Sequence, residues 1–161
     1  MKYRQALLIA AAVISVFLYG QDCEKAEGPV TGKVCGEVAA DLGKSPLLEA
    51  APPAEANELY FKVFSNQVPP PALPEAFAGH ALVLVYAGEY RHAGYKLEVE
   101  EKGFSRGELV LTAGVKEDTS NTFHAQVITR PYCLLAVNPQ KVDTVRLETD
   151  LDFGRSKVAI E

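Results

Sequence analysis

The residue types that most often carry out catalysis are sparse along this chain and lack the spacing of a catalytic or metal site. The three histidines, His80, His92 and His124, do not follow the helical or finger-type spacing of zinc ligands. Neither a glycine-rich phosphate loop nor the serine elbow of hydrolases occurs in the sequence. Cys133 lies inside an apolar strand pattern, which is a poor setting for a nucleophile. The sequence therefore predicts a protein that is not an enzyme and that holds no metal or cofactor.

Two loops contain residue types that favour tight corners and protein contact. "GEYRHAGYKLEVE" (88–100) turns at Gly94 into an alternating strand, and "TRPYCLLAV" (129–137) enters a strand at Pro131. Gly94 is expected to have a positive φ or to allow a close approach of another backbone segment. Pro131 suits the start of a strand, and the peptide bond before it can be trans or cis. One hypothesis is that both corners only shape turns. If instead the loops lie side by side, the candidate protein-binding residues are Glu89, Tyr90, Arg91, His92, Gly94, Tyr95, Arg130, Pro131 and Tyr132.

Short strands must position these corners. The run at 80–88 is apolar throughout, as in a strand buried on both faces, whereas the run at 95–101 alternates apolar and charged residues, as in a half-exposed strand. Such strands recur every 8 to 14 residues with Gly, Pro, Asn or Asp between them, which predicts a mainly β fold, either an antiparallel β-sandwich or a small barrel. The strands expected after 95–101 are 107–115, 121–130, 132–139, 141–149 and 157–161.

The beginning of the chain differs in composition from the remainder. Residues 1–20 contain two basic residues followed by a 13-residue apolar stretch. This pattern is typical of a signal peptide, here with cleavage expected near Gly20. The alternative is an uncleaved membrane anchor. Residues 21–57 are rich in Ala, Gly, Glu and Pro and are expected to form a short, partly helical or irregular lead-in, with a short helix or two within 36–50. Residues 58–161 then form one β-rich domain, whose first segment fits a strand or a helix.

Export makes disulfides permissible, and the chain contains three cysteines. The expected pair is Cys23 with Cys35, whose short loop would contribute roughly 2 to 3 kcal/mol in the chain-entropy treatment. Cys133 is then a buried thiol that packs as a small hydrophobe. The alternative for Cys23, which follows the apolar stretch, is lipidation. Attachment to a membrane is expected only through that lipid or through an uncleaved signal.

The charge balance excludes one class of partner. The chain has 16 basic and 21 acidic residues, a formal net charge of -5. Removal of residues 1–20 leaves 14 basic residues against 21 acidic ones, a net charge of -7. Because the sequence also lacks a basic cluster, it has no electrostatic footprint for nucleic acid.

The order of these patterns resembles the PrcB-like family of envelope protease-complex subunits, described from their C-terminal domain. The stretches that carry the resemblance are "ALVLVYAGEYRHAGYKLEVE" (81–100), "GELVLTAGV" (107–115) and "TRPYCLLAV" (129–137). The loop "RHAGY" departs from the Pro-Thr-Gly-Gly-Tyr that is usual in the family. The resemblance implies an exported, non-catalytic protein-binding module of the periplasm or cell envelope, or a secreted one. Its partner would be a secreted or envelope protease, which it accompanies as a subunit or stabilises.

Two other functions are open at this point. Chagasin-type inhibitors of cysteine proteases also present a loop ending in Gly-Tyr and a later Arg-Pro-aromatic loop from an immunoglobulin-like sandwich. The order of "RHAGY" and "RPY" is the same here, but the chain lacks tryptophan, which those inhibitors carry. The third hypothesis is a structural envelope domain with no protease link. Exposed loop tips would favour the inhibitor, and fully packed corners would favour the structural domain.

Overall fold

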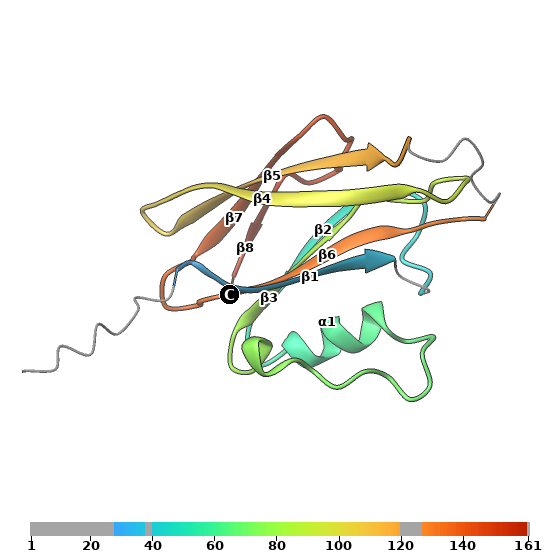
Figure 1. The fold of residues 1–161 in the computed structure, drawn as a ribbon. Helices are drawn as coiled ribbons and strands as arrows, with labels where there is room; N and C mark the ends of the chain where they lie inside the picture. The colour runs from blue at the N-terminus through green and yellow to red at the C-terminus, as the bar shows by residue number, and fades with distance from the viewer. Residues whose placement is uncertain (1–27, 38–39, 120–126, 161) are drawn as a thin grey trace, which may run out of the picture.

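Two four-stranded sheets pack face to face, and one helix covers the outer face of the first sheet (Figure 1). The computed structural model describes residues 28–37, 40–119 and 127–160. The predicted mainly β sandwich is confirmed, and the alternative of a small closed barrel is wrong. In the described part of the chain, no helix has both the length and the apolar character needed to cross a membrane.

The first sheet explains why two stretches of the sequence are apolar throughout. Its strand order is β1 (Val30–Glu37), β6 (Pro131–Val137), β3 (Ala81–Tyr86), β2 (Leu47–Ala51), and all neighbours are antiparallel. Every residue of the central strands β3 and β6 is buried. Alternate side chains of these strands enter the core between the sheets, and the others enter the core under the helix. Both faces are therefore covered, and neither face admits polar residues.

The second sheet has the order β4 (Tyr95–Ser105), β5 (Glu108–Glu117), β7 (Thr144–Thr149), β8 (Lys157–Ala159). The predicted alternation of β4 is confirmed, because Leu97 and Val99 are buried while their neighbours along the strand are exposed. The sheet is mixed and not wholly antiparallel, since β5 and β7 run parallel. The physical reason is the crossover: after β5 the chain forms β6 in the first sheet and only then returns to the second.

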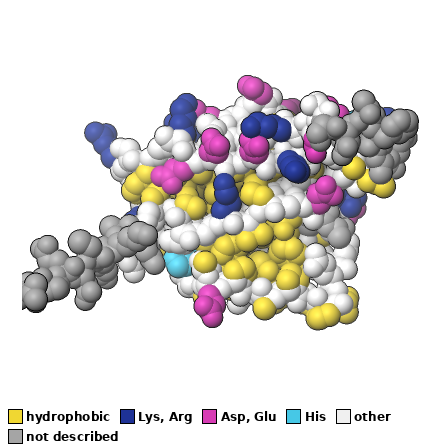
Figure 2. All heavy atoms as spheres, in the orientation of Figure 1, with side chains coloured by type: hydrophobic (Ala, Val, Ile, Leu, Met, Phe, Trp, Pro, Cys, Tyr) yellow, Lys and Arg dark blue, Asp and Glu magenta, His cyan; other side chains and the backbone are white. Residues whose placement is uncertain are grey.

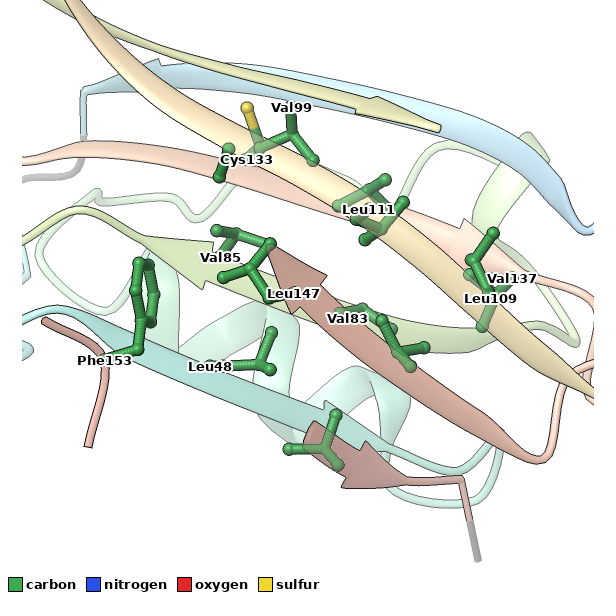
Figure 3. Packing of buried hydrophobic residues seen from close by; sticks show 14 of the residues in the cluster. Leu48, Val83, Val85, Val99, Leu109, Leu111, Cys133, Val137, Leu147 and Phe153 are labelled. Atoms are coloured by element: carbon green, nitrogen blue, oxygen red, sulfur yellow. The ribbon is translucent and has the colours of Figure 1, made fainter. Parts of the chain in front are cut away.

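Two hydrophobic clusters fill the spaces between the layers. The cluster between the sheets joins side chains from β3, β5, β6 and β7, such as Val85, Leu111 and Leu147 (Figure 3). The other lies between the first sheet and the segment containing α1 (Ala56–Val63) and the short 3-10 helix η1 (Glu75–Phe77). The segment at 58–64, which fitted either a strand or a helix, thus belongs mostly to α1.

The structure alters the expectations for two other segments. The lead-in expected at 21–57 contains β1 and β2, and these strands complete the first sheet, so the short helix expected within 36–50 is wrong for the residues described there. Of the strand expected at 121–130, residues 127–130 contribute one isolated bridge, at Thr129, and residues 121–126 lie outside the described part. Residues 1–20, the expected signal peptide, also lie outside it.

The disulfide joins Cys35 to Cys133, not to Cys23 as expected. β1 lies beside β6 in a register that places Cys35 directly opposite Cys133, with 4.1 Å between their Cα atoms. The expected pairing rested on proximity in sequence, whereas sheet pairing brings together residues that are 98 positions apart. Cys133 is thus not a free buried thiol, and Cys23 lies outside the described residues.

Candidate protein-binding surface at two paired corners

The two predicted corners lie side by side at one end of the sandwich. Tyr90 and Thr129 exchange two backbone hydrogen bonds, each with 2.9 Å between nitrogen and oxygen. The Thr129 hydroxyl also donates to the carbonyl oxygen of His92 at 3.1 Å. Thr129 is only 2 % exposed, so a buried polar side chain with a satisfied hydroxyl holds the loops together.

An ion pair makes a second connection between the corners. The Nε and Nη2 atoms of Arg130 donate to Oε1 of Glu89 at 3.0 and 2.6 Å. The two side chains are only 21 % and 16 % exposed. The hydrogen bond to Glu89 is the main reason that the pKa of Arg130 is raised above its ordinary value. Hydrogen bonds between charged groups are stronger than neutral ones, so this pair fixes the relative position of the loops.

Beside the ion pair, the rings of Tyr90 and His92 each pack at a tilt against the ring of Tyr95. The ring centres of Tyr90 and Tyr95 are 4.4 Å apart, and those of His92 and Tyr95 are 4.7 Å apart. The Tyr95 hydroxyl lies 3.1 Å from Nε2 of His92. Burial, and then the charge of Tyr95, raise the pKa of Tyr90. All three rings are partly exposed, so they combine an apolar body with polar edges in contact with solvent.

Glycines allow the first corner its shape. Gly94 has φ of 97°, which confirms the positive φ predicted for it. Gly88 has φ of 90°, and a Cβ atom there would lie 2.7 Å from the carbonyl oxygen of Lys44. The amide of Glu89 donates to that same oxygen at 3.1 Å, so the segment before β2 supports the corner from behind.

Two of the predicted surface residues are buried instead. Tyr132 is 4 % exposed, and its ring packs edge to face against Phe64 in the core under α1, with 5.9 Å between ring centres. Pro131 is also buried. Successive side chains of β6 point to opposite faces, so Cys133 enters the core between the sheets and Tyr132 enters the other one. The cis peptide bond of the described residues is at Val68–Pro69, and Arg130–Pro131 is therefore trans.

Two apolar residues at this end were missed by the sequence interpretation. Val127 and Ile128 are 51 % and 61 % exposed, immediately before Thr129. Both fall within the strand expected at 121–130, whereas the structure assigns no strand to them. The antiparallel bridge of Tyr90 with Thr129 brings Ile128 next to Arg91, which is also exposed. We call the following set the corner surface: Tyr90, Arg91, His92, Tyr95, Val127 and Ile128.

A cavity of about 300 Å³ adjoins the corner surface between β1 and β4. Tyr95 lines it, together with Cys35, Leu97 and their neighbours in these strands. Among the described residues, no group of three or more His, Cys, Asp or Glu side chains is placed to hold a metal ion. The arrangement offers aromatic, apolar and positively charged contacts for recognition.

Both corners fall within a region that is shared with other proteins. Residues 81–138, from the start of β3 to just beyond β6, match the family model described as PrcB C-terminal. This region of the chain is PrcB-like. The match confirms the resemblance, and it covers all of the PrcB-like corners together with the central strands that support them. Comparisons with curated proteins and with solved structures gave no significant match.

Proposed function

We propose that this chain is an exported, non-catalytic protein-binding module that accompanies a secreted or envelope protease as a subunit or stabilising partner. The observation that supports the proposal is the corner surface, which lies entirely inside the PrcB-like region. We further propose that the protein works in the periplasm or cell envelope, or after secretion. No nucleic acid is expected among its partners, because the balance of charge is acidic.

The corner surface has the physical properties of an interface centre. Its loops are held by the bridge at Thr129 and the ion pair of Arg130 with Glu89, so little ordering is needed when a partner binds. It exposes one arginine, two tyrosines and two aliphatic side chains, and aromatic residues and arginine are enriched at the centres of interfaces. Binding residues are commonly carried by loops that a rigid scaffold positions.

Inhibition of a protease is the second candidate function. The exposed pair Val127 and Ile128 favours it, because exposed apolar side chains are suited to an apolar cleft. A papain-type cysteine protease assayed with and without this protein tests that function directly. Inhibition that disappears on Ile128→Asp would support the inhibitor at the expense of the subunit.

The main test is co-isolation from an envelope extract of the source organism. Protein expressed from the full chain is immobilised in its native form, as an Arg91→Glu, Ile128→Asp double variant, and as Arg106→Glu. Arg106 is another exposed arginine, in the hairpin between β4 and β5 at the other end of β4 from Tyr95. We expect a protease to be retained by the native protein and by Arg106→Glu. The double variant is expected to retain at least about tenfold less.

Equal retention of the protease by all three forms would contradict a role for the corner surface. Retention of no protease by the native protein would contradict the protease link itself. Thermal unfolding of the three forms serves as the folding control. The exchanged side chains are exposed, so we expect the melting temperatures to agree closely.

A further inference from the structure

We propose that the free edge of strand β2 accepts an extended segment of a protein partner as an added strand. This inference does not rest on the corner surface or on the protease link. β2 is the last strand of the first sheet, and among the described residues it pairs with β3 alone. Addition of a strand supplies main-chain hydrogen bonds for affinity, while pockets beside the strand provide specificity.

The backbone groups available for this pairing can be identified. The amide of Ala87 donates to the carbonyl of Pro131, so residue 87 and every second residue before it in β3 face β6. The backbone N–H and C=O groups of Leu82, Leu84 and Tyr86 therefore face β2. Their partners in β2 are Ala51, Glu49 and Leu47. Leu48 and Ala50 therefore direct their N–H and C=O groups away from the sheet. Such an edge is a template for a further strand.

The other three sheet edges carry protection that β2 lacks. In β1 the register shifts once, and the exposed Lys33 reaches across to β4, where it donates to the carbonyl of Val99 at 2.9 Å. β4 has a register shift and exposed lysines, and β8 has only three residues. β2 has an unbroken register over five residues. Its one charged side chain, Glu49, is paired with Lys62 at 2.6 Å. Lysine side chains, bulges and shortness are among the usual protections of an edge.

A groove runs along this unprotected edge. Three cavities of about 500, 430 and 310 Å³ follow β2 from its first residue to its last, and Glu49 lines all of them. The segment that carries Arg155 and β8 forms one wall. α1 and the residues just before it form the other. The edge is therefore recessed, which suits a single extended chain.

The recess argues against a second copy of this chain as the occupant. The β2 strand of such a copy would be recessed to the same extent, so the two edges would be held apart by their walls. Antiparallel pairing through Leu48 and Ala50 would also place Glu49 of one copy opposite Glu49 of the other. Like charges in directly opposed positions destabilise a strand pair.

The charges of the groove indicate the chemistry of the segment. Arg155 lines the cavities near the start and middle of β2, and it has no hydrogen-bond or ion-pair partner among the described residues. Glu58 lines the cavity at the other end, and Glu55 lines both that cavity and the middle one. Neither glutamate has an ion-pair partner in the described part of the chain. The complementary segment is about five residues long, roughly 17 Å. It carries an acidic residue toward Arg155, a basic residue toward the two glutamates, and compact side chains between them.

The test is an NMR titration of isotope-labelled protein, expressed from the full chain, with a defined probe. The probe is the blocked peptide Asp-Thr-Val-Thr-Val-Thr-Lys, and its control has the same sequence with the three central backbone nitrogens methylated. We expect the unmethylated peptide to shift the amide resonances of Leu48 and Ala50. We expect the methylated peptide, which cannot donate those hydrogen bonds, to leave the resonances unchanged.

Variants then assign the contact. Ala50→Pro removes an outward amide without touching the bonds to β3 and is expected to abolish binding. Arg155→Glu is expected to weaken binding by about tenfold, and Arg106→Glu, the matched arginine outside the groove, to leave it unchanged. If Ala50→Pro fails to fold, Arg155→Glu and the methylated peptide still decide the question.

Three results would overturn the proposal. The first is the absence of shifts at millimolar peptide, and the second is binding that survives both groove variants. The third is a set of shifts at β2 that depend on protein concentration in the absence of peptide, which would assign the edge to a second copy. If the co-isolation experiment contradicted a role for the corner surface, the results of this peptide titration would still stand.

Discussion

Tyr86 is fully buried in the central strand β3, and its hydroxyl donates to the carbonyl oxygen of Gly43 at 2.7 Å. This bond ties the segment before β2 to the strand that leads into the first corner. Burial is the main reason that the pKa of Tyr86 is raised from 10.0 to about 12. The folded state therefore keeps this proton at a pH at which the unfolded chain has released it. The contribution to stability is complete below pH 10 and is lost as the pH rises toward 12.

Replacement of Tyr86 tests that linkage. At neutral pH we expect Tyr86→Phe to lower the free energy of unfolding by about 1 kcal/mol, because the hydrogen bond to Gly43 is lost while the ring remains. Between pH 10 and pH 12 the variant should lose less stability than the native protein does. Urea unfolding at both ends of this range measures the difference. Parallel declines of the two proteins would show that Tyr86 is not the group responsible.

Gly107 is required by the hairpin between β4 and β5. It has φ of 77°, and a Cβ atom there would collide with the carboxylate of Asp143. We expect Gly107→Ala to cost about 1 to 3 kcal/mol of stability, through backbone strain and the displaced carboxylate. Gly103→Ala, in the same hairpin, is the control, because its Cβ would meet nothing within 4 Å. Equal melting temperatures for the two variants would contradict this account.

At the corners, the local sequence predicts the conformation or exposure of some residues and not of others. Gly94 was predictable because a polar loop that turns abruptly into a strand requires a residue tolerant of positive φ. Tyr132 was misplaced because "YCLLAV" is apolar at every position, and such a run conceals which side chain faces which core. The exposure of Val127 and Ile128 follows from a crossover between sheets, and apolar alternation over a few residues cannot reveal it.

At the scale of elements, the strands that follow residue 80 could be predicted, and the two that precede it could not. β3 and β4 carry clear signals, one apolar throughout and the other alternating. β1 reads "VTGKVCGE", with glycines and few apolar residues, and β2 is five residues between prolines. Both are edge strands, where partial exposure relaxes the apolar pattern. Their place in the sheet is set by pairing with distant strands, which carries no local signal.

The disulfide fastens the edge strand β1 to the centre of the first sheet. For two cysteines 98 positions apart, the chain-entropy treatment gives a stabilisation of about 4.7 kcal/mol. We expect a Cys35→Ala, Cys133→Ala variant to lose stability of this order, and β1 to exchange its amide hydrogens faster. Urea unfolding and hydrogen exchange measure the two effects. Cys23→Ala should leave both unchanged, and a comparable loss in that variant would contradict the assigned pairing.

At the scale of the whole molecule, charge is distributed unevenly between the layers. Acidic and basic side chains gather over the second sheet, whereas hydrophobic side chains are more prominent around β1 and the helix layer (Figure 2). On the second sheet a network runs from Lys102 to Glu148, Arg146, Glu108 and Lys157, and so links all four strands. Hydrogen bonds from the basic side chains lower the pKa of both glutamates below 4.5.

A lowered carboxyl pKa sets the direction of the acid response. The folded state releases these protons more readily than the unfolded chain does, so the network stabilises above about pH 4.5. That stability is lost as the pH falls through the lowered values. We expect Glu108→Gln to show a shallower decline in acid and a weaker dependence on salt. Glu101→Gln, on the same sheet but outside the network, is the control, and chemical unfolding across this pH range is the measurement.

The disulfide between β1 and β6 also determines the effect of a cut in the backbone. It closes a covalent ring that contains the first corner, the β4–β5 hairpin and most of both sheets. Exposed loop tips are where proteases most often nick a folded chain. A single nick anywhere inside the ring leaves both pieces attached to one another, and the packed layers keep them in register. A molecule built in this way can be cleaved by a neighbouring protease and still remain one molecule.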